Sequence, residues 1–449
     1  MPATTLDSQI FSDLFTTSEM RAIFSDETRV AFYLEIEAAL ARAEAGLGVI
    51  PQDAAREIVA KCRIETIDLA KLKEQTDRAG SPIIGLVAQI VAACADGHGE
   101  WAHWGATTQD ITDTATVMQI RDALALVERD IDAIAAALKA LAVKHRDLPM
   151  AGRSKLQQAV PITFGYKCAT YLAAMQRHRE RLREFKARVL VGEFGGAVGT
   201  LASLGKDGLK VQAALMKELK LGEPDITWHT LRDRFGEVGA FLALLTATCA
   251  KIATDVKLLM QTEVGEVREG FAAGRGTSST MPQKRNPVSS PLIHTGASLV
   301  RHNANALLEA AVGDHERMTG PWEIEWIAIP EIFLLTSGVL RHTRELTEGL
   351  EVDAVQMLRN LALTKGLIVS EAVMMGLGPH LGRQHAHHLV ADICREVVRS
   401  GVPLIELLTS NKEIAKVMSR AELEKLVDPA NYVGVAGEMV DRVVAKEKP

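Results

Sequence analysis

Residues 115–144 read ATVMQIRDALALVERDIDAIAAALKALAVK, and this stretch decides the fold class. Its large apolar side chains alternate in steps of three and four: Val117, Ile120, Leu124, Val127, Ile131, Ile134, Leu138 and Leu141. That spacing places them on one stripe of an α-helix. A helix of this length extends about 45 Å at ~1.5 Å per residue. The stripe can therefore be buried only against other long helices.

A second long helix is predicted over residues 237–263. Phe241, Leu245, Ile252, Val256 and Leu259 lie on one side of it. The uncharged stretch 238–250 indicates burial nearly all round. Both an ordinary bundle within one chain and a bundle shared between subunits fit this pattern, and we favour the shared one.

The rest of the chain favours shorter helices and no run of alternating strands. We predict an all-α fold of three mainly helical domains, at 1–110, 111–350 and 351–449, with a bundle of long helices in the central one. The 449 residues are 47% hydrophobic but only 4% aromatic, so the core must consist of Ala, Leu, Val and Ile. Ala and Leu lose little side-chain entropy in a helix, which favours the same fold class.

Composition also excludes several classes of protein. The net charge of −6 gives no basic footprint for nucleic acid and no polybasic patch for a membrane. Residues 1–15 do not resemble a signal peptide, and the longest uncharged run, 79–95, contains Gly80 and Pro82 and is too short to span a membrane. We expect a cytoplasmic enzyme with no nucleic-acid or membrane partner.

Nothing in the sequence indicates a metal or an organic cofactor. The five cysteines are scattered and form no CxxC pair. His385, His387 and His388 fall on a predicted helix without a supporting cluster of carboxylates. We therefore expect no metal site and no cofactor.

The stretch GRGTSSTMPQKRNP, residues 274–287, carries the clearest chemistry. Its glycines allow a loop that closes over a ligand. Ser278 and Ser279 supply adjacent hydroxyls, and a serine can exchange a proton when its neighbours stabilise the oxygen. Lys284 and Asn286 together suit a carboxylate. On these residues alone, a polar surface loop remains an equal alternative.

This loop resembles the signature Ser-Ser-x-Met-Pro-x-Lys-x-Asn-Pro of the fumarase/aspartase superfamily, with every fixed position filled. The resemblance implies that Ser278 is the catalytic base next to a substrate carboxylate, and that Lys284 and Asn286 bind carboxylate. Ser279 is a further candidate contact. HWGATTQD, residues 103–110, resembles the first segment of the family, which implies carboxylate contacts from Thr107 and Thr108. For Asp110 an ordinary helix-capping role remains open.

GRSKLQQAVP, residues 152–161, resembles the second family segment, usually Gly-Arg-Thr-His, but Lys155 stands at the histidine position. The glutamate that usually pairs with that histidine is replaced by Pro291. Loss of both partners suggests a site rebuilt for different chemistry. Arg153 is a possible further carboxylate donor. Lys155 is either an active-site cation or a solvated lysine at a helix end.

The bacterial 3-carboxy-cis,cis-muconate cycloisomerases are the branch most similar to this pattern, since they lack the same pair. They usually place a histidine where Gln158 stands, and glutamine can hydrogen-bond to substrate but cannot titrate. Trp326 stands where adenylosuccinate lyases usually have an arginine, which argues against recognition of a nucleotide.

The resemblance implies a lyase-type enzyme that acts on a small polycarboxylate through a carbanion, with lactonisation of 3-carboxy-cis,cis-muconate as the leading hypothesis. The alternatives are a C–N lyase that releases fumarate from an N-substituted aspartate and a catalytically silent, crystallin-like relative. The resemblance also implies a homotetramer with a 20-helix core and active sites shared between subunits.

Overall fold

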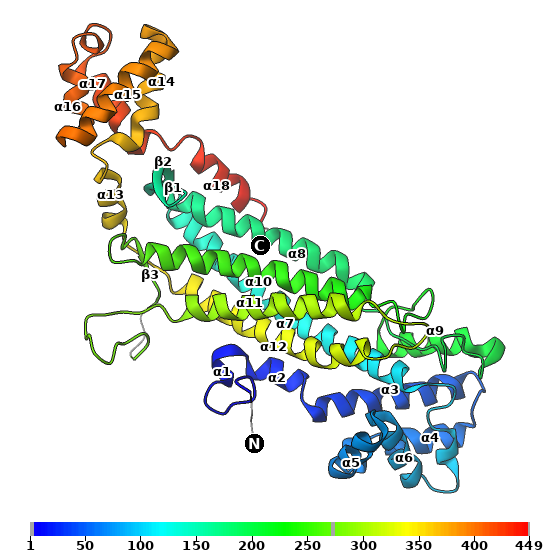
Figure 1. Cartoon of the computed structure of the whole chain (residues 1–449). Coiled ribbons are helices and arrows are strands. Elements are labelled where there is room, and N and C mark those ends of the chain that lie inside the picture. The colour runs from blue at the N-terminus through cyan, green and yellow to red at the C-terminus, as the bar shows by residue number, and fades with distance from the viewer. Residues whose placement is uncertain (1–3, 271–273, 448–449) are drawn as a thin grey trace. The chain divides into compact units, whose positions relative to one another are not determined.

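The computed structural model describes residues 4–270 and 274–447, and 68% of the chain is helical (Figure 1). This confirms the predicted all-α class. The chain divides into two compact units. Unit 1 contains residues 1–131, 178–249 and 292–341, and unit 2 contains 132–177, 250–291 and 342–449. The division into three domains predicted above stays a prediction.

Short helices of unit 1 begin and end at residues with clear local reasons. Thr17 caps α2, Ser25 caps α3 and Asp68 caps α5, each by accepting a backbone N–H. Gly80, at φ +73°, ends α5, and Pro82 opens α6, where no N–H is needed. The helices that lie wholly within this unit are α1 Ser12–Phe15, α2 Ser18–Ile23, α3 Asp26–Gly46, α4 Gln52–Lys61, α5 Leu69–Ala79, α6 Pro82–Ala93 and α9 Gly208–Leu219.

The long helices contain residues of both units. They are α7 Thr108–Lys144, α8 Phe164–Val189, α10 Asp233–Leu259, α11 Ser289–Ala310 and α12 Pro321–Glu348. The apolar stripe from Val117 to Leu138 is at most 1% exposed, so the first predicted helix is confirmed and begins earlier, at Thr108. The second predicted helix is confirmed as α10. Leu244 on α10 is 54% exposed, so burial all round is not achieved within one chain.

Unit 2 contains two short antiparallel strand pairs that the sequence analysis did not predict. Strand β1, Pro149–Ser154, pairs with β2, Gln157–Thr163, with an irregularity between Ala151 and Arg153. The turn between them places Lys155 and Leu156 at φ +51° and +64°, a conformation that usually signals itself by Asn or Gly. The second pair is β3 Val267–Arg268 with β4 Glu351–Val352.

The C-terminal helices of unit 2 form an apolar core of their own, in which α14, α15, α16 and α17 pack together (Figure 1). Val373, Leu377 and Leu404 are fully buried there. The C-terminal helices of unit 2, of which α14 to α17 form this core, are α13 Ala354–Ala362, α14 Ser370–Leu381, α15 Arg383–Ser400, α16 Leu404–Ser410, α17 Arg420–Val427 and α18 Ala436–Val444. The histidines at 385, 387 and 388 lie on α15, as predicted.

Among the described residues, α10 is long and apolar enough to cross a membrane, and so is the bent pair 354–362 with 367–381. The test concerns length and composition alone, and 61% of the apolar window of α10 is buried. A mostly buried core helix passes the same test.

Candidate active site

The start of α7 offers unpaired donors to an anion. Thr107 and Thr108 are half-buried, and their hydroxyls have no hydrogen-bond partner among the described residues. The first N–H groups of a helix lack partners within the helix, and the positive end of the helix dipole lies there. A carboxylate is therefore stabilised at this point, which suits the role predicted for both threonines.

Asp110 fixes the position of this turn. The Asp110 Oδ2 atom accepts from the backbone N–H of Thr107 at 3.0 Å and of Gly196 at 2.9 Å. Its Oδ1 atom accepts from Gly195 N at 2.9 Å and from His229 Nε2 at 2.7 Å. The side chain is fully buried. Asp110 therefore caps the helix start, as one alternative held, and also attaches two distant segments to it.

Arg317 joins a further segment to the same turn. Its guanidinium donates to Gly196 O at 2.6 Å, to Ala197 O at 3.0 Å and to Gln109 Oε1 at 2.8 Å. The stretches 107–110, 195–197 and 315–317 thus lie together.

Asp110, Glu193 and His229 offer atoms within 4.8 Å of one another that could hold a metal ion. Both Asp110 oxygens already accept two hydrogen bonds each. Burial raises the pKa of Glu193 to about 9, helped by the charges of Asp110 and Asp113, so the group is neutral near pH 7. The carboxylate of Asp110 therefore already serves to hold the turn.

A buried ion-pair network continues along α7. Arg232, 1% exposed, donates to Asp113 at 2.6 and 3.0 Å and to Glu325 at 2.9 and 2.5 Å. The Arg232 guanidinium also lies 4.9 Å from the ring centroid of Trp228. The sequence analysis missed this network, because each member stands alone in its own stretch and only the fold brings the charges together.

The signature loop is closed at its base. Asn286 N donates to Gly276 O at 2.9 Å, and Thr277 and Arg285 form an antiparallel bridge. Gly276 has φ +68°, and a Cβ there would lie 2.3 Å from Asn286 O, so only glycine fits. Arg285 is held by Glu351 at 2.8 and 3.0 Å. Residues 278–284 therefore project from a fixed stem.

Ser278 lies at the beginning of the projecting part. Its Oγ accepts from Thr280 N at 3.2 Å and Met281 N at 3.0 Å. Two N–H donors stabilise negative charge on that oxygen and make it easier for the hydroxyl to release its proton. Ser279 and Lys284 are exposed and Asn286 is half-buried. The side chains of Lys284 and Asn286 have no partner among the described residues, so they can take a ligand.

The helix that follows the loop is capped by Glu269. Its carboxylate accepts from the backbone N–H groups of Val288, Ser289 and Ser290, each at 2.9 Å. The start of α11 is therefore already neutralised. Pro291 lies in this first turn, where its missing N–H costs nothing. A structural reason thus exists for proline at the position where the family usually places glutamate.

The second family segment is the β1–β2 hairpin. Arg153 donates to Glu266 at 2.9 and 2.6 Å, and Glu266, fully buried, also accepts from Asn360 at 2.7 Å. Gln158 Nε2 donates to Asn360 O at 2.9 Å, and its Oε1 is buried without a partner. Arg153 and Gln158 are thus linked through Asn360. Arg153 can offer a substrate only its remaining N–H groups.

Lys155 lies at the exposed tip of this hairpin. Of the alternative of a solvated lysine at a helix end, the exposure is confirmed and the helix end is wrong, because Lys155 lies in a hairpin turn. Of the candidate residues, Thr107 and Thr108 belong to unit 1. The others belong to unit 2: Arg153, Lys155, Gln158, Ser278, Ser279, Lys284 and Asn286.

Comparison with known proteins identifies one family and relatives with different activities. Residues 14–301 match the family described as "Lyase", and residues 366–443 match "Adenylosuccinate lyase C-terminus". The chain is 55% identical to trans-aconitate decarboxylase 1 of Mycosarcoma maydis, over 97% of this chain and 88% of that protein. It is 46% identical to 3-carboxy-cis,cis-muconate cycloisomerase of Pseudomonas aeruginosa, over 98% and 96%.

Among solved structures, the 3-carboxy-cis,cis-muconate lactonizing enzyme of Pseudomonas putida superposes with a TM-score of 0.92. The two are 42% identical, and the match covers 98% of this chain and 99% of that one. The signature loop, the Thr-Thr turn and the long helices thus occur together in a chain that belongs to the fumarase/aspartase (fumarate lyase) superfamily of lyases.

Proposed function

We propose that this enzyme acts on an unsaturated tricarboxylate, and that Ser278 delivers one proton to a carbanion formed next to a carboxylate. The observation that carries the proposal is the pair of backbone N–H groups on Ser278 Oγ, from Thr280 and Met281. They stabilise the oxygen that remains after the proton has left. Both 3-carboxy-cis,cis-muconate and trans-aconitate, named for two relatives, are unsaturated tricarboxylates.

The missing His–Glu pair supports a reaction with one proton transfer. In lactonisation, a carboxylate oxygen of the substrate adds to a carbon–carbon double bond of the same molecule. The electron pair of that bond moves to the carbon beside another carboxylate. That carbon takes one proton. No group leaves, so no second acid is needed. Lys155 and Pro291 at the usual positions of the pair are compatible with this chemistry.

Decarboxylation of trans-aconitate has the same proton balance. The bond to one carboxylate breaks and CO2 leaves without a proton. The electron pair passes through the double bond to the carbon beside a remaining carboxylate, which is then protonated. A C–N lyase must in addition protonate a departing amine. The C–N lyase alternative therefore fits this site less well.

The proposed roles follow from the groups that are available. Thr107 and Thr108, at the start of α7, hold one carboxylate with their free hydroxyls, while the Thr107 N–H stays on Asp110. Lys284 and Asn286 hold a carboxylate beside the reacting carbon, where preorganised charge stabilises the carbanion. Lactonisation is the leading reaction. Decarboxylation is the second candidate, which the 55% identity to trans-aconitate decarboxylase 1 favours.

We also propose a homotetramer whose active sites combine residues of different subunits. Leu244 supports an assembly, because a large apolar side chain in the middle of a core-type helix is 54% exposed in the single chain. The proposed substrate-binding residues lie at the start of the long helix α7, on the β1–β2 hairpin and on a projecting loop, which suits sites assembled from several chains.

The test offers purified protein three substrates. Loss of diene absorbance reports on 3-carboxy-cis,cis-muconate, CO2 release on trans-aconitate, and fumarate absorbance on adenylosuccinate. We expect turnover of one of the first two, a fall in kcat of about 10²–10⁴-fold in Ser278→Ala, and no change in the control Ser410→Ala. Release of fumarate alone would overturn the proposal. If the protein turns over none of the three substrates, the alternative of a catalytically silent relative is favoured instead.

A further inference from the structure

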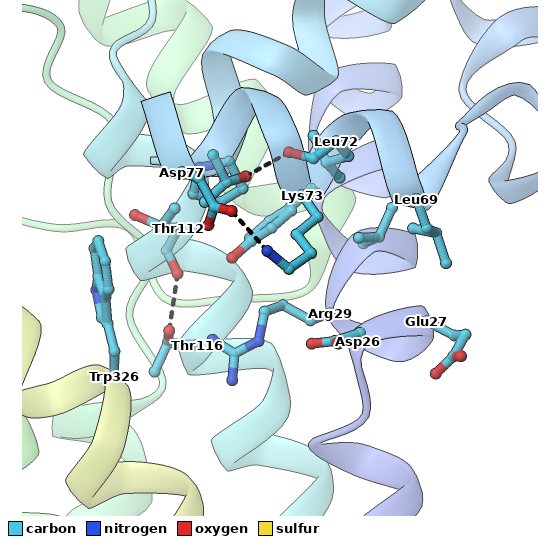
Figure 2. A pocket seen from close by; sticks show the side chains of 14 residues that line it. Asp26, Glu27, Arg29, Leu69, Leu72, Lys73, Asp77, Thr112, Thr116 and Trp326 are labelled. Atoms are coloured by element: carbon cyan, nitrogen blue, oxygen red, sulfur yellow. Dashed lines mark hydrogen bonds and ion pairs between the residues drawn. The ribbon is translucent and has the colours of Figure 1, made fainter. Parts of the chain in front are cut away.

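Unit 1 contains a cavity of about 410 Å³ between α3, α5, α6, α7 and α12 (Figure 2). Tyr33 and Leu72 form part of its buried wall, and the Trp326 ring forms another side. Figure 2 shows the Arg29 side chain extending into the space beside Thr116. None of the residues discussed so far as substrate contacts lines this cavity.

The cavity is connected to the Thr-Thr turn by one face of α7. Thr108, Thr112 and Thr116 are four residues apart and so lie on one face. The hydroxyls of Thr112 and Thr116 donate to Thr108 O at 3.2 Å and to Thr112 O at 2.8 Å. Thr112 and Thr116 line the cavity. The cavity therefore begins about 6 Å, one helical turn, beyond Thr108.

Arg29 has no carboxylate within ion-pair distance among the described residues, although the exposed side chains of Asp26 and Glu27 line the same cavity. The other cation at the cavity, exposed Lys73, is paired with Asp77 at 2.6 Å. Arg29 also acts on Tyr33: burial raises the pKa of that phenol, and the Arg29 charge opposes the rise. A half-buried guanidinium without a counter-ion attracts an anion and can bind a carboxylate through two N–H groups.

Further donors lie at the cavity or next to a residue that lines it. Pro82, the first residue of α6, lines the cavity, and the preceding residue, Ser81, which is not a lining residue, has a buried hydroxyl without a partner. Trp326 offers an indole N–H with no hydrogen-bond partner among the described residues, on a ring that can cover a carbon chain.

We propose that this cavity binds the distal carboxylate of the substrate, with Arg29 as its counter-ion. The inference rests on the proposed function and extends it. One carboxylate binds at Thr107 and Thr108, the carbon chain lies against Trp326, and a second carboxylate meets Arg29 more than a helical turn away. The enzyme therefore selects tricarboxylates over shorter dicarboxylates by this contact.

Equilibrium binding tests the subsite without turnover. Calorimetry on the intact protein uses propane-1,2,3-tricarboxylate and succinate as ligands. In Arg29→Met we expect the Kd for the tricarboxylate to rise about tenfold, as loss of a charged hydrogen bond implies, and the Kd for succinate to stay unchanged. Arg29→Lys should recover part of the loss. Lys71→Met, which removes an exposed charge outside the cavity, is the matched control.

The outcomes separate the two proposals. Equal tricarboxylate binding by wild type and Arg29→Met would overturn the subsite, whether or not the enzyme turns over a tricarboxylate. If wild type turns over neither tricarboxylate but binds propane-1,2,3-tricarboxylate through Arg29, the proposed function fails and the subsite stands. Competition by inorganic phosphate equal to that by the tricarboxylate would show a general anion site and overturn the assignment to substrate.

Discussion

The carboxylate of Asp110 accepts the backbone N–H of Thr107 at 3.0 Å, so the residue that orders the start of α7 is three positions away from a threonine proposed to bind substrate. The same carboxylate accepts three more hydrogen bonds, from Gly195, Gly196 and His229. Asp110 is therefore a positioning residue. It holds the helix start while the threonine hydroxyls remain free for a ligand.

Asp110→Asn should weaken this arrangement. The amide replaces one accepting oxygen with a donor that faces N–H groups, and a hydrogen bond to a charged group contributes about 1.5–3 kcal/mol. We expect the free energy of unfolding in urea to fall by about 2–4 kcal/mol and KM to rise more than kcat falls. Asp122→Asn, on the same helix, serves as control. A fall in kcat and in the free energy of unfolding, with KM unchanged, would contradict a positioning role.

The start of α7 shows what a sequence can predict. Thr-Thr-Gln-Asp before an apolar repeat indicates a helix start by local chemistry, and the structure begins α7 at Thr108. The partners of Asp110 lie 85, 86 and 119 residues away. Local periodicity contains no information about such contacts. The hairpin was missed for a related reason, because Lys155-Leu156 is not a turn sequence that normally indicates φ > 0.

Stability should fall as the pH rises from about 4.3, the unfolded pKa of a glutamate, toward 9, because Glu44 is buried with no partner for either oxygen. Burial, together with the charge of Glu37, raises its pKa to about 9, above an unfolded value of about 4.3. The folded protein therefore holds this proton at pH values where the unfolded chain has already lost it. The contribution of Glu44 to the free energy of unfolding is fully present below the unfolded pKa. That contribution is lost as pH rises toward 9, at about 1.4 kcal/mol per pH unit.

Glu44→Gln should flatten this dependence. We expect urea midpoints measured from pH 6 to 9 to fall less steeply in the variant than in wild type, with Glu193 responsible for part of the remaining slope. Glu35→Gln, at an exposed position of the same helix, should leave the slope unchanged. A variant slope equal to that of wild type would show that Glu44 is already ionised in the folded protein.

The proposed assembly depends on the exposed side of α10. Leu244→Glu places a charge on a surface that a shared bundle would bury, so light scattering should detect species smaller than the tetramer, with helical circular dichroism retained. If active sites are shared between subunits, turnover should be lost at the same time. Leu209→Glu, at a 71% exposed position of α9, is the control. Monomeric wild type with full activity would refute the assembly.

Lys155 occupies the family's histidine position in a left-handed conformation that costs a residue other than glycine about 1–2 kcal/mol. A charged side chain kept at such a turn suggests a role in binding, so we expect Lys155 to contact a substrate carboxylate. Lys155→Asn suits the turn and removes the charge. Its stability should be equal or higher, while KM for the tricarboxylate rises about tenfold as a charged hydrogen bond is lost. Leu156→Gly relieves the same strain without changing charge and should leave KM unchanged. If both variants bind substrate like wild type, Lys155 is only a turn residue, and Ser278 remains the group proposed to transfer the proton.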